Sequence, residues 1–268
     1  MSFEYLPAYL GLGVIAGLLG GALGLGGGVV LVPGLLLILH WMGVPIDVAT
    51  QTAVATSLAT IVLTSTSAIR AHHSKGNVRW EIVSKLAVGI LLGAFAGAFV
   101  ADWLSGPLLA QLFGGFAVLV ALQMLFSSTR PEDPAAVERL PGPVGLTACG
   151  GIIGVLSSLF GIGGGSLTVP MLNAFKVPMR QAVAVSSACG FPIAVAGCTG
   201  FIIAGWGDAR LPTGSFGYVF LPAALGIGIA SYPMAKVGAQ LATLLPAATL
   251  KRVFALLLVI IGVRLALG

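Results

Sequence analysis

A cluster of glycines inside apolar sequence occurs twice in this chain, and it constrains the fold more than any other feature. Residues 24–28 read Gly-Leu-Gly-Gly-Gly and run into Val32-Pro33; residues 161–165 read Gly-Ile-Gly-Gly-Gly and run into Val169-Pro170, 137 positions later. Such clusters are costly inside a helix. Membrane helices tolerate glycine and proline better, because neighbouring helices re-satisfy the freed backbone groups. The pattern predicts two helix breaks in a membrane protein, one in each half of an internal duplication.

The composition supports a membrane location. Of the 268 residues, 57% are hydrophobic and only 8% are charged, with a mean hydropathy of +1.06, whereas soluble domains carry about 25% charged residues. Several apolar runs are long enough to span a bilayer core of about 30 Å. They do not alternate as the strands of a β-barrel do. We therefore expect an all-α polytopic membrane protein, in which many of the 39 glycines allow close helix packing.

The apolar runs predict about ten transmembrane helices, some of them short or broken. The run after the first glycine cluster would cover only about 20 Å as a helix, less than the bilayer core. Residues 127–142 form a hydrophilic linker, so residues 1–126 and 143–268 are expected to be two transmembrane repeats. The expected spans are 6–23, 29–41, 48–69, 82–103, 107–126, 143–160, 166–175, 179–204, 215–236 and 246–267.

The duplication extends beyond the glycine clusters. Val44-Pro45 matches Val177-Pro178, and Leu92-Gly93 matches Leu225-Gly226. The Ala-Val-Ala sequences that begin at positions 53 and 182 also match, which places Ser57 opposite Ser186. An internal repeat in a membrane protein is typical of secondary transporters.

The positions of the basic residues predict the topology. If the short segments cross the membrane, each half crosses five times and the halves are inverted; with both termini outside, eleven Lys and Arg residues are cytoplasmic, against two outside, Arg210 and Arg264. If the short segments are re-entrant, the best split is only 8 to 5. The positive-inside rule favours ten crossings and explains the net charge of +5 without nucleic acid. The cytoplasmic group comprises Arg70, Lys75, Arg79, Lys85, Arg130, Arg139, Lys176, Arg180, Lys236, Lys251 and Arg252.

Two interpretations of the glycine clusters stay open. A nucleotide-phosphate loop is excluded because neither cluster has a preceding strand or a following Lys-Ser/Thr pair. The clusters serve either close helix packing or a discontinuous helix at a substrate site. In the second case, short helices starting near Val29 and Ser166 would direct their positive N-termini at one central anion. Its binding residues would include Gly26, Gly27, Gly28, Gly163, Gly164, Gly165 and Ser166.

Small polar side chains gather on the segments that follow each cluster. Their hydroxyls either bond back to their own helices or donate to the oxygens of an anion, and the repeat makes Ser57 and Ser186 the strongest candidates. Asp, Glu, Lys and Arg are missing from the middle of the expected spans, which argues against a proton relay or a cation site. The candidates are Thr52, Thr56, Ser57, Gln181, Ser186 and Ser187.

Other reactive residues give no enzyme signature. Histidines 72 and 73 fall in the expected basic loop, where we interpret them as solvated side chains. Cys149, Cys189 and Cys198 lie in apolar segments without metal-ligand spacing, so they are expected to pack. No spacing brings a serine and a histidine together at membrane depth. We therefore expect no enzyme activity, no metal and no cofactor.

The doubled Gly-x-Gly-Gly-Gly motif running into Val-Pro, the Val-Pro turn and the Ala-Val-Ala-x-Ser segment resemble the sulfite exporter TauE/SafE family, as does residue run 71–78 followed by Trp80. The resemblance covers nearly the whole chain. It implies a multi-pass transporter in a bacterial or archaeal inner membrane that moves a small anion, sulfite or an organosulfonate, outward. The alternative is a channel-like or scaffold membrane protein without coupled transport. The oligomeric state, a homo-oligomer included, is left open.

Overall fold

The apolar runs form helices in the computed structural model, which describes residues 4–23, 27–126, 139–244 and 247–267. Gly26 and most of the predicted linker lie outside these ranges. Nearly all of the expected spans coincide with a helix to within a few residues. The helices are α1 (Leu6–Leu23), α2 (Gly28–Trp41), α3 (Ile46–His73), α4 (Trp80–Trp103), α5 (Gly106–Phe126), α6 (Pro143–Leu159), α7 (Gly165–Ala174), α8 (Met179–Ala204), α9 (Leu221–Leu244) and α10 (Ala247–Leu267).

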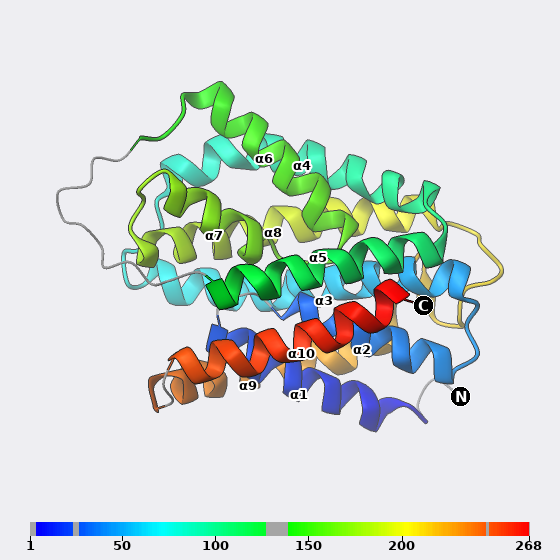
Figure 1. Ribbon diagram of the computed structural model, residues 1–268. Coiled ribbons are helices and arrows are strands. Elements are labelled where there is room, and N and C mark those ends of the chain that lie inside the picture. The colour runs from blue at the N-terminus through cyan, green and yellow to red at the C-terminus, as the bar shows by residue number, and fades with distance from the viewer. Residues whose placement is uncertain (1–3, 24–26, 127–138, 245–246, 268) are drawn as a thin grey trace.

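These helices pack side by side in one bundle and run along a common direction (Figure 1). Both labelled termini lie at one end, which we call the terminal end (Figure 1). The turn from α3 to α4 lies at the other end, which we call the basic end. Helices α3, α4, α5 and α8 are each long and apolar enough to cross a membrane. The expected all-α polytopic membrane fold is confirmed, whereas the inversion of the halves relative to a membrane stays a prediction.

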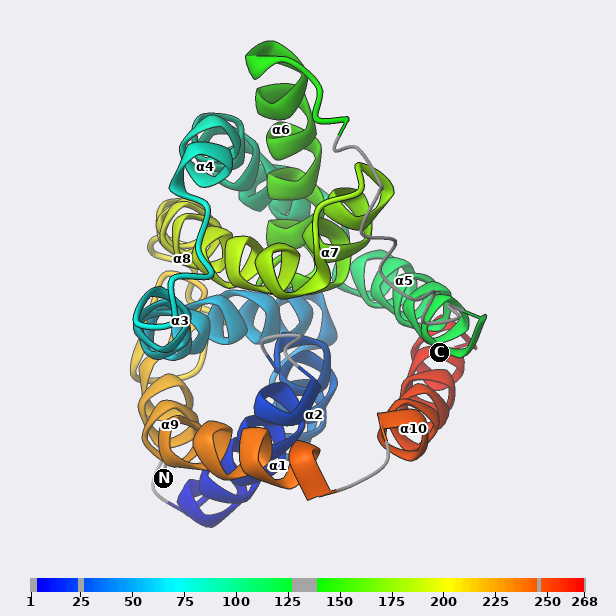
Figure 2. The same ribbon diagram turned by 90° about the vertical axis from the view of Figure 1, so that its left-hand side faces the viewer.

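One glycine-rich helix pair is built twice. Gly13 of α1 packs against the carbonyl of Ile227 in α9, and Gly150 of α6 packs against the carbonyl of Leu86 in α4. These pairs are equivalent, because α6 follows α1 by 137 positions and α9 follows α4 by 141. In both pairs the missing side chain lets two backbones touch, as small residues do in membrane helices. Figure 2 shows the pairs on opposite sides of α3 and α8.

The same contacts correct one match made from the sequence. Pairing Leu92-Gly93 with Leu225-Gly226 relates α4 to α9 by 133 positions, whereas the helix contacts relate them by 141. Gly97 against Val155 and Gly238 against Leu18 confirm the second value. The error arose because two-residue matches between Leu-Gly-rich helices occur easily by chance.

The ninth expected span also needs a correction at its start. Residues 215–220 form an antiparallel hairpin, β1 (Ser215–Phe216) and β2 (Val219–Phe220), and α9 begins only at Leu221. Gly217 turns the hairpin with a φ of 55°. The segment is apolar because Val219 and Phe220 are buried, and the backbone N–H of Phe220 donates to the Thr56 hydroxyl at 3.0 Å.

Candidate functional site

The two glycine breaks are in contact inside the bundle. Gly27 precedes α2 with a φ of 71°, and Gly164 precedes α7 with a φ of 75°; glycine adopts this left-handed backbone without the cost that a Cβ imposes. Gly28 lies so near the second break that an added Cβ would be 2.5 Å from the carbonyl oxygen of Gly161. The structure therefore brings the two predicted breaks to one point, from which α2 and α7 begin.

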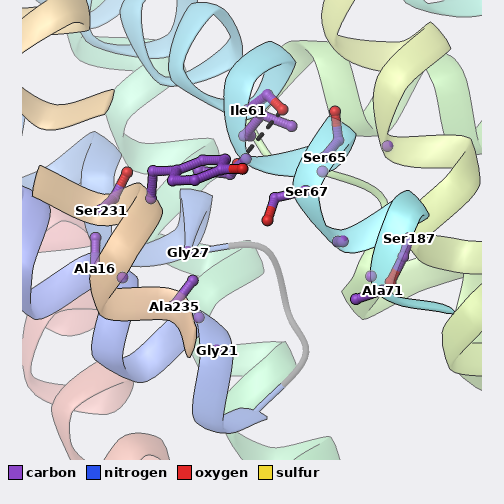
Figure 3. Close-up of a pocket in the computed structure, with 18 of the residues that line it drawn as sticks. Ala16, Gly21, Gly27, Ile61, Ser65, Ser67, Ala71, Ser187, Ser231 and Ala235 are labelled. Carbon is purple, nitrogen blue, oxygen red and sulfur yellow. Dashed lines mark hydrogen bonds between the residues drawn. The ribbon is translucent and has the colours of Figure 1, made fainter. Parts of the chain in front are cut away.

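A cavity of about 580 Å³ extends from this point toward the basic end. Gly27, Gly163 and Gly165 line its inner part, and Lys75 and Lys236 line it farther out. Figure 3 shows it between α1, α3 and α9, with Ala16, Gly21 and Ser67 around it. No Asp or Glu is present among its described lining residues. Two ammonium groups and the positive end of helix α2 therefore set its electrostatic character.

The serine hydroxyls around this cavity fall into two groups. Ser65, Ser187 and Ser231 donate back to carbonyl oxygens of their own helices at 3.2, 2.9 and 3.3 Å. Ser67 and Ser186 also line the cavity, and within the described ranges neither hydroxyl has a hydrogen-bond partner. Among the described serines of the lining, these two are therefore the ones whose hydroxyl has a proton free to donate to a ligand.

Five of the residues predicted for the site line the cavity: Gly27, Gly163, Gly165, Ser186 and Ser187. The repeat paired Ser57 with Ser186, yet the structure separates them. The Ser57 hydroxyl donates to the carbonyl oxygen of Gly161 at 2.8 Å and is fully buried. In this arrangement Ser57 holds the second glycine cluster in place rather than facing the cavity.

The remaining predicted residues also lie outside the cavity lining. Thr52 donates to Val48 of its own helix at 2.7 Å, Thr56 accepts from the hairpin, and the Gln181 carbonyl accepts from Arg79 at 3.5 Å. The others, Gly28, Gly164 and Ser166, are buried at the two breaks.

Sequence reasoning missed the basic end of the cavity. His72 and His73 belong to the last turn of α3 rather than to a loop, and His72 lines the cavity together with Lys75. The Nδ1 atom of His72 is buried without a hydrogen-bond partner among the described residues. Helix α3 has 28 residues, about 42 Å, so it extends beyond the apolar run that ends at Ile69. Hydropathy therefore gave no signal for these residues, because they lie in the polar extension of α3 beyond the apolar run.

The described residues show no other chemical centre. They contain no group of three His, Cys, Asp or Glu side chains that could hold a metal ion. Cys149, Cys189 and Cys198 are free thiols, and Cys189 is fully buried.

Comparison with known proteins agrees with this architecture. Residues 9–265 match the sequence profile of the family described as "Sulfite exporter TauE/SafE". The chain belongs to this family. A "Probable membrane transporter protein" of Haemophilus influenzae is 37% identical over 99% of each chain. One of Methanocaldococcus jannaschii is 30% identical over 90% of this chain and 89% of its own length. No solved structure matches the chain significantly. The chain is thus a membrane transporter of the TauE/SafE family and not an enzyme.

Proposed function

We propose that this TauE/SafE protein transports a small sulfur-containing oxyanion, sulfite or an organosulfonate, and exports it from the cell. The description of the family model supports the substrate class. The observation that carries the proposal is the cavity itself: it joins two contacting helix breaks to two lysines, and its described lining contains no carboxylate.

Each part of the cavity has a role in this proposal. Lys75 and Lys236 attract the anion at the basic end, where solvent and salt screen them. The free hydroxyls of Ser67 and Ser186 replace water around its oxygens. Gly27 leaves the start of α2 uncovered, so backbone N–H groups can approach the anion closely. Neutral donors and helix ends bind it weakly enough for release, because no permanent charge lies at the centre.

An anion screen tests the substrate class. Purified protein is titrated by calorimetry with sulfite, sulfate, thiosulfate, taurine, sulfoacetate, chloride and acetate, and substrate flux is measured in proteoliposomes. We expect saturable binding and flux for at least one sulfur anion. Lys75→Gln and Lys236→Gln should each weaken binding, and the weakening should shrink at high salt. Lys85→Gln, an exposed lysine outside the cavity, is the matched control. Equal response to all anions, or non-saturable flux, would contradict the proposal in favour of a channel-like protein.

The direction of transport requires the basic end to face the cytoplasm, because the open cavity would then collect substrate from inside the cell. Single cysteines in the connecting segments 70–79 and 174–181 should be labelled by impermeant reagents only from the cytoplasmic side. The connecting segments 40–47 and 205–213 should be labelled only from outside. Labelling of segments 70–79 and 174–181 from opposite sides would contradict the inverted repeat.

A further inference from the structure

The second half of the chain contains a closed counterpart of the cavity. In the open cavity, helices α1 and α2 contribute Gly20, Gly21 and Leu31 to the lining. The 137-residue offset of the glycine motif places Ser157, Ser158 and Thr168 at the corresponding positions of the second half. All three counterparts are fully buried. Their hydroxyls have no hydrogen-bond partner among the described residues. Three of the residues that border open space in one half are thus matched by unsatisfied buried hydroxyls in the other.

These hydroxyls surround the second break. A Cβ placed on Gly164 would be 3.4 Å from the Thr168 hydroxyl oxygen, 3.8 Å from that of Ser157 and 2.5 Å from Cδ1 of Ile193. On α8, Gly197 is the residue against which the Ser158 hydroxyl packs. Leaving a buried hydroxyl without a partner is unfavourable. Three of them lie close together in a region closed by apolar contacts, and a second arrangement of the protein that exposes this region would satisfy all three.

A seal separates this region from the terminal end. One turn along α8 from Gly197 lies Phe201, which is buried and meets the Tyr218 ring edge-on at a centroid distance of 6.2 Å. The Tyr218 hydroxyl donates to the Asp102 carboxylate at 2.8 Å. A tyrosine hydroxyl is protonated at neutral pH and can donate this bond, and burial raises the pKa of Tyr218 further. The hairpin that carries Tyr218 therefore closes the bundle between the three hydroxyls and the terminal end.

We propose that Ser157, Ser158 and Thr168 line a second passage, closed in this structure, through which the anion leaves toward the terminal end. The identity of the ligand rests on the proposed function; the passage does not. Opening it would break the Tyr218–Asp102 bond, move Ile193 away from Gly164 and expose the three hydroxyls as donors to the same oxyanion. Inverted repeats provide such exchange, because each half can adopt the arrangement of the other.

Cysteine accessibility tests the passage. Thr168→Cys and Ser157→Cys are made in full-length protein whose Cys149, Cys189 and Cys198 are replaced by alanine, and reconstituted vesicles are treated with an impermeant thiol reagent from either side. Lys75→Cys marks the basic end and Arg210→Cys the terminal end. We expect both new thiols to react from the terminal end. Leu31→Cys, the counterpart of Thr168, should react from the basic end, and Ile152→Cys, on the apolar outer face of α6, should not react.

A second variant tests the seal. Tyr218→Phe removes a hydrogen bond to a carboxylate and should accelerate labelling of Thr168→Cys from the terminal end about tenfold or more. Tyr5→Phe, whose hydroxyl bonds the Trp41 carbonyl, should leave the rate unchanged. Thiols that stay unreactive in a protein with measurable flux, or that react only from the basic end, would overturn the passage. Terminal-end labelling in a protein that binds no sulfur anion would uphold the passage and refute the proposed substrate.

Discussion

The two glycine breaks have the same backbone but different surroundings. Gly27 and Gly164 both hold a left-handed φ and both precede a short helix. Gly27 lines the open cavity, and a Cβ there would be 3.0 Å from the carbonyl oxygen of Ala16. A Cβ on Gly164 would instead be 2.5 Å from Cδ1 of the buried Ile193. The residues seven positions before each break are also matched in position, yet Gly20 borders open space and Ser157 is fully buried.

The difference shows that a duplicated sequence does not require equal halves in one structure. Each break needs glycine for its turn, so the motif is the same in both halves. What surrounds the break depends on how the long helices α3 and α8 and their partners pack, and this packing has closed one side and left the other open. The glycine motif therefore sets the backbone turn in both halves, whereas the packing of the surrounding helices decides which half has an open cavity.

The largest expected effect comes from filling each break. Leucine at position 27 or 164 forces a left-handed backbone onto a residue with a Cβ, at about 1–2 kcal/mol. A Cβ on Gly164 would be 2.5 Å from Cδ1 of the buried Ile193, a closer contact than the 3.0 Å between a Cβ on Gly27 and the Ala16 carbonyl oxygen. Overpacking costs about 1–3 kcal/mol, so Gly164→Leu should lower the free energy of unfolding more than Gly27→Leu does. Gly27→Leu should abolish anion binding by filling the cavity, and Gly164→Leu should abolish it by displacing its neighbours Gly163 and Gly165, which line the cavity. Unfolding in detergent and titration calorimetry measure both quantities.

The control for this pair is Gly115→Leu, because Gly115 of α5 has open space around it. It should keep near-normal affinity. Tight anion binding by both break variants would reduce the glycine clusters to packing elements, and equal destabilisation would remove the difference between the halves.

A smaller effect distinguishes the two serines that the repeat pairs. Ser186→Ala removes a free cavity donor; a hydrogen bond to a charged acceptor contributes roughly 1.5–3 kcal/mol, so affinity should fall about ten- to a hundredfold. Ser57→Ala instead leaves the buried Gly161 carbonyl without its partner and should cost about 1–3 kcal/mol of stability. Calorimetry and unfolding are compared with the exposed control Ser84→Ala. A large affinity loss in Ser57→Ala without loss of stability would return Ser57 to the binding site.

Much of the fold was predictable because hydropathy and the glycine motif both act locally. Runs of apolar residues marked nearly all helices, and the doubled cluster indicated two breaks that meet. The hairpin at Ser215 was not predictable, because a buried strand and a membrane helix share the same composition. The same holds for the site residues. The motif does not distinguish Ser186 from Ser57, and only the packing of the helices places Ser186 at the cavity and Ser57 against Gly161. His72 and Lys75 lie just beyond the apolar run that ends at Ile69, and Lys236 lies more than 150 positions farther along the chain. Only the packing of α3 against α9 brings these residues to one cavity, so the sequence did not indicate them.

The smallest expected effect concerns the acidic residues. Asp47→Asn, Glu81→Gln and Asp102→Asn, made one at a time, should each leave flux within about twofold, because the described cavity lining contains no carboxylate and a proton relay needs one at membrane depth. Asparagine at position 102 still accepts from Tyr218. Proteoliposome flux on correctly folded variants measures this. A variant that folds but no longer transports would identify a carboxylate relay.

Protection of a cavity thiol by substrate tests the central claim most directly. Ser67→Cys is labelled from the basic end, with and without saturating sulfite or taurine, and Arg70→Cys, an exposed site outside the cavity on the same helix, is the control. The anion that is transported should slow labelling of Ser67→Cys and leave Arg70→Cys unaffected. Equal labelling of Ser67→Cys with and without every transported anion would show that the cavity is not the anion site.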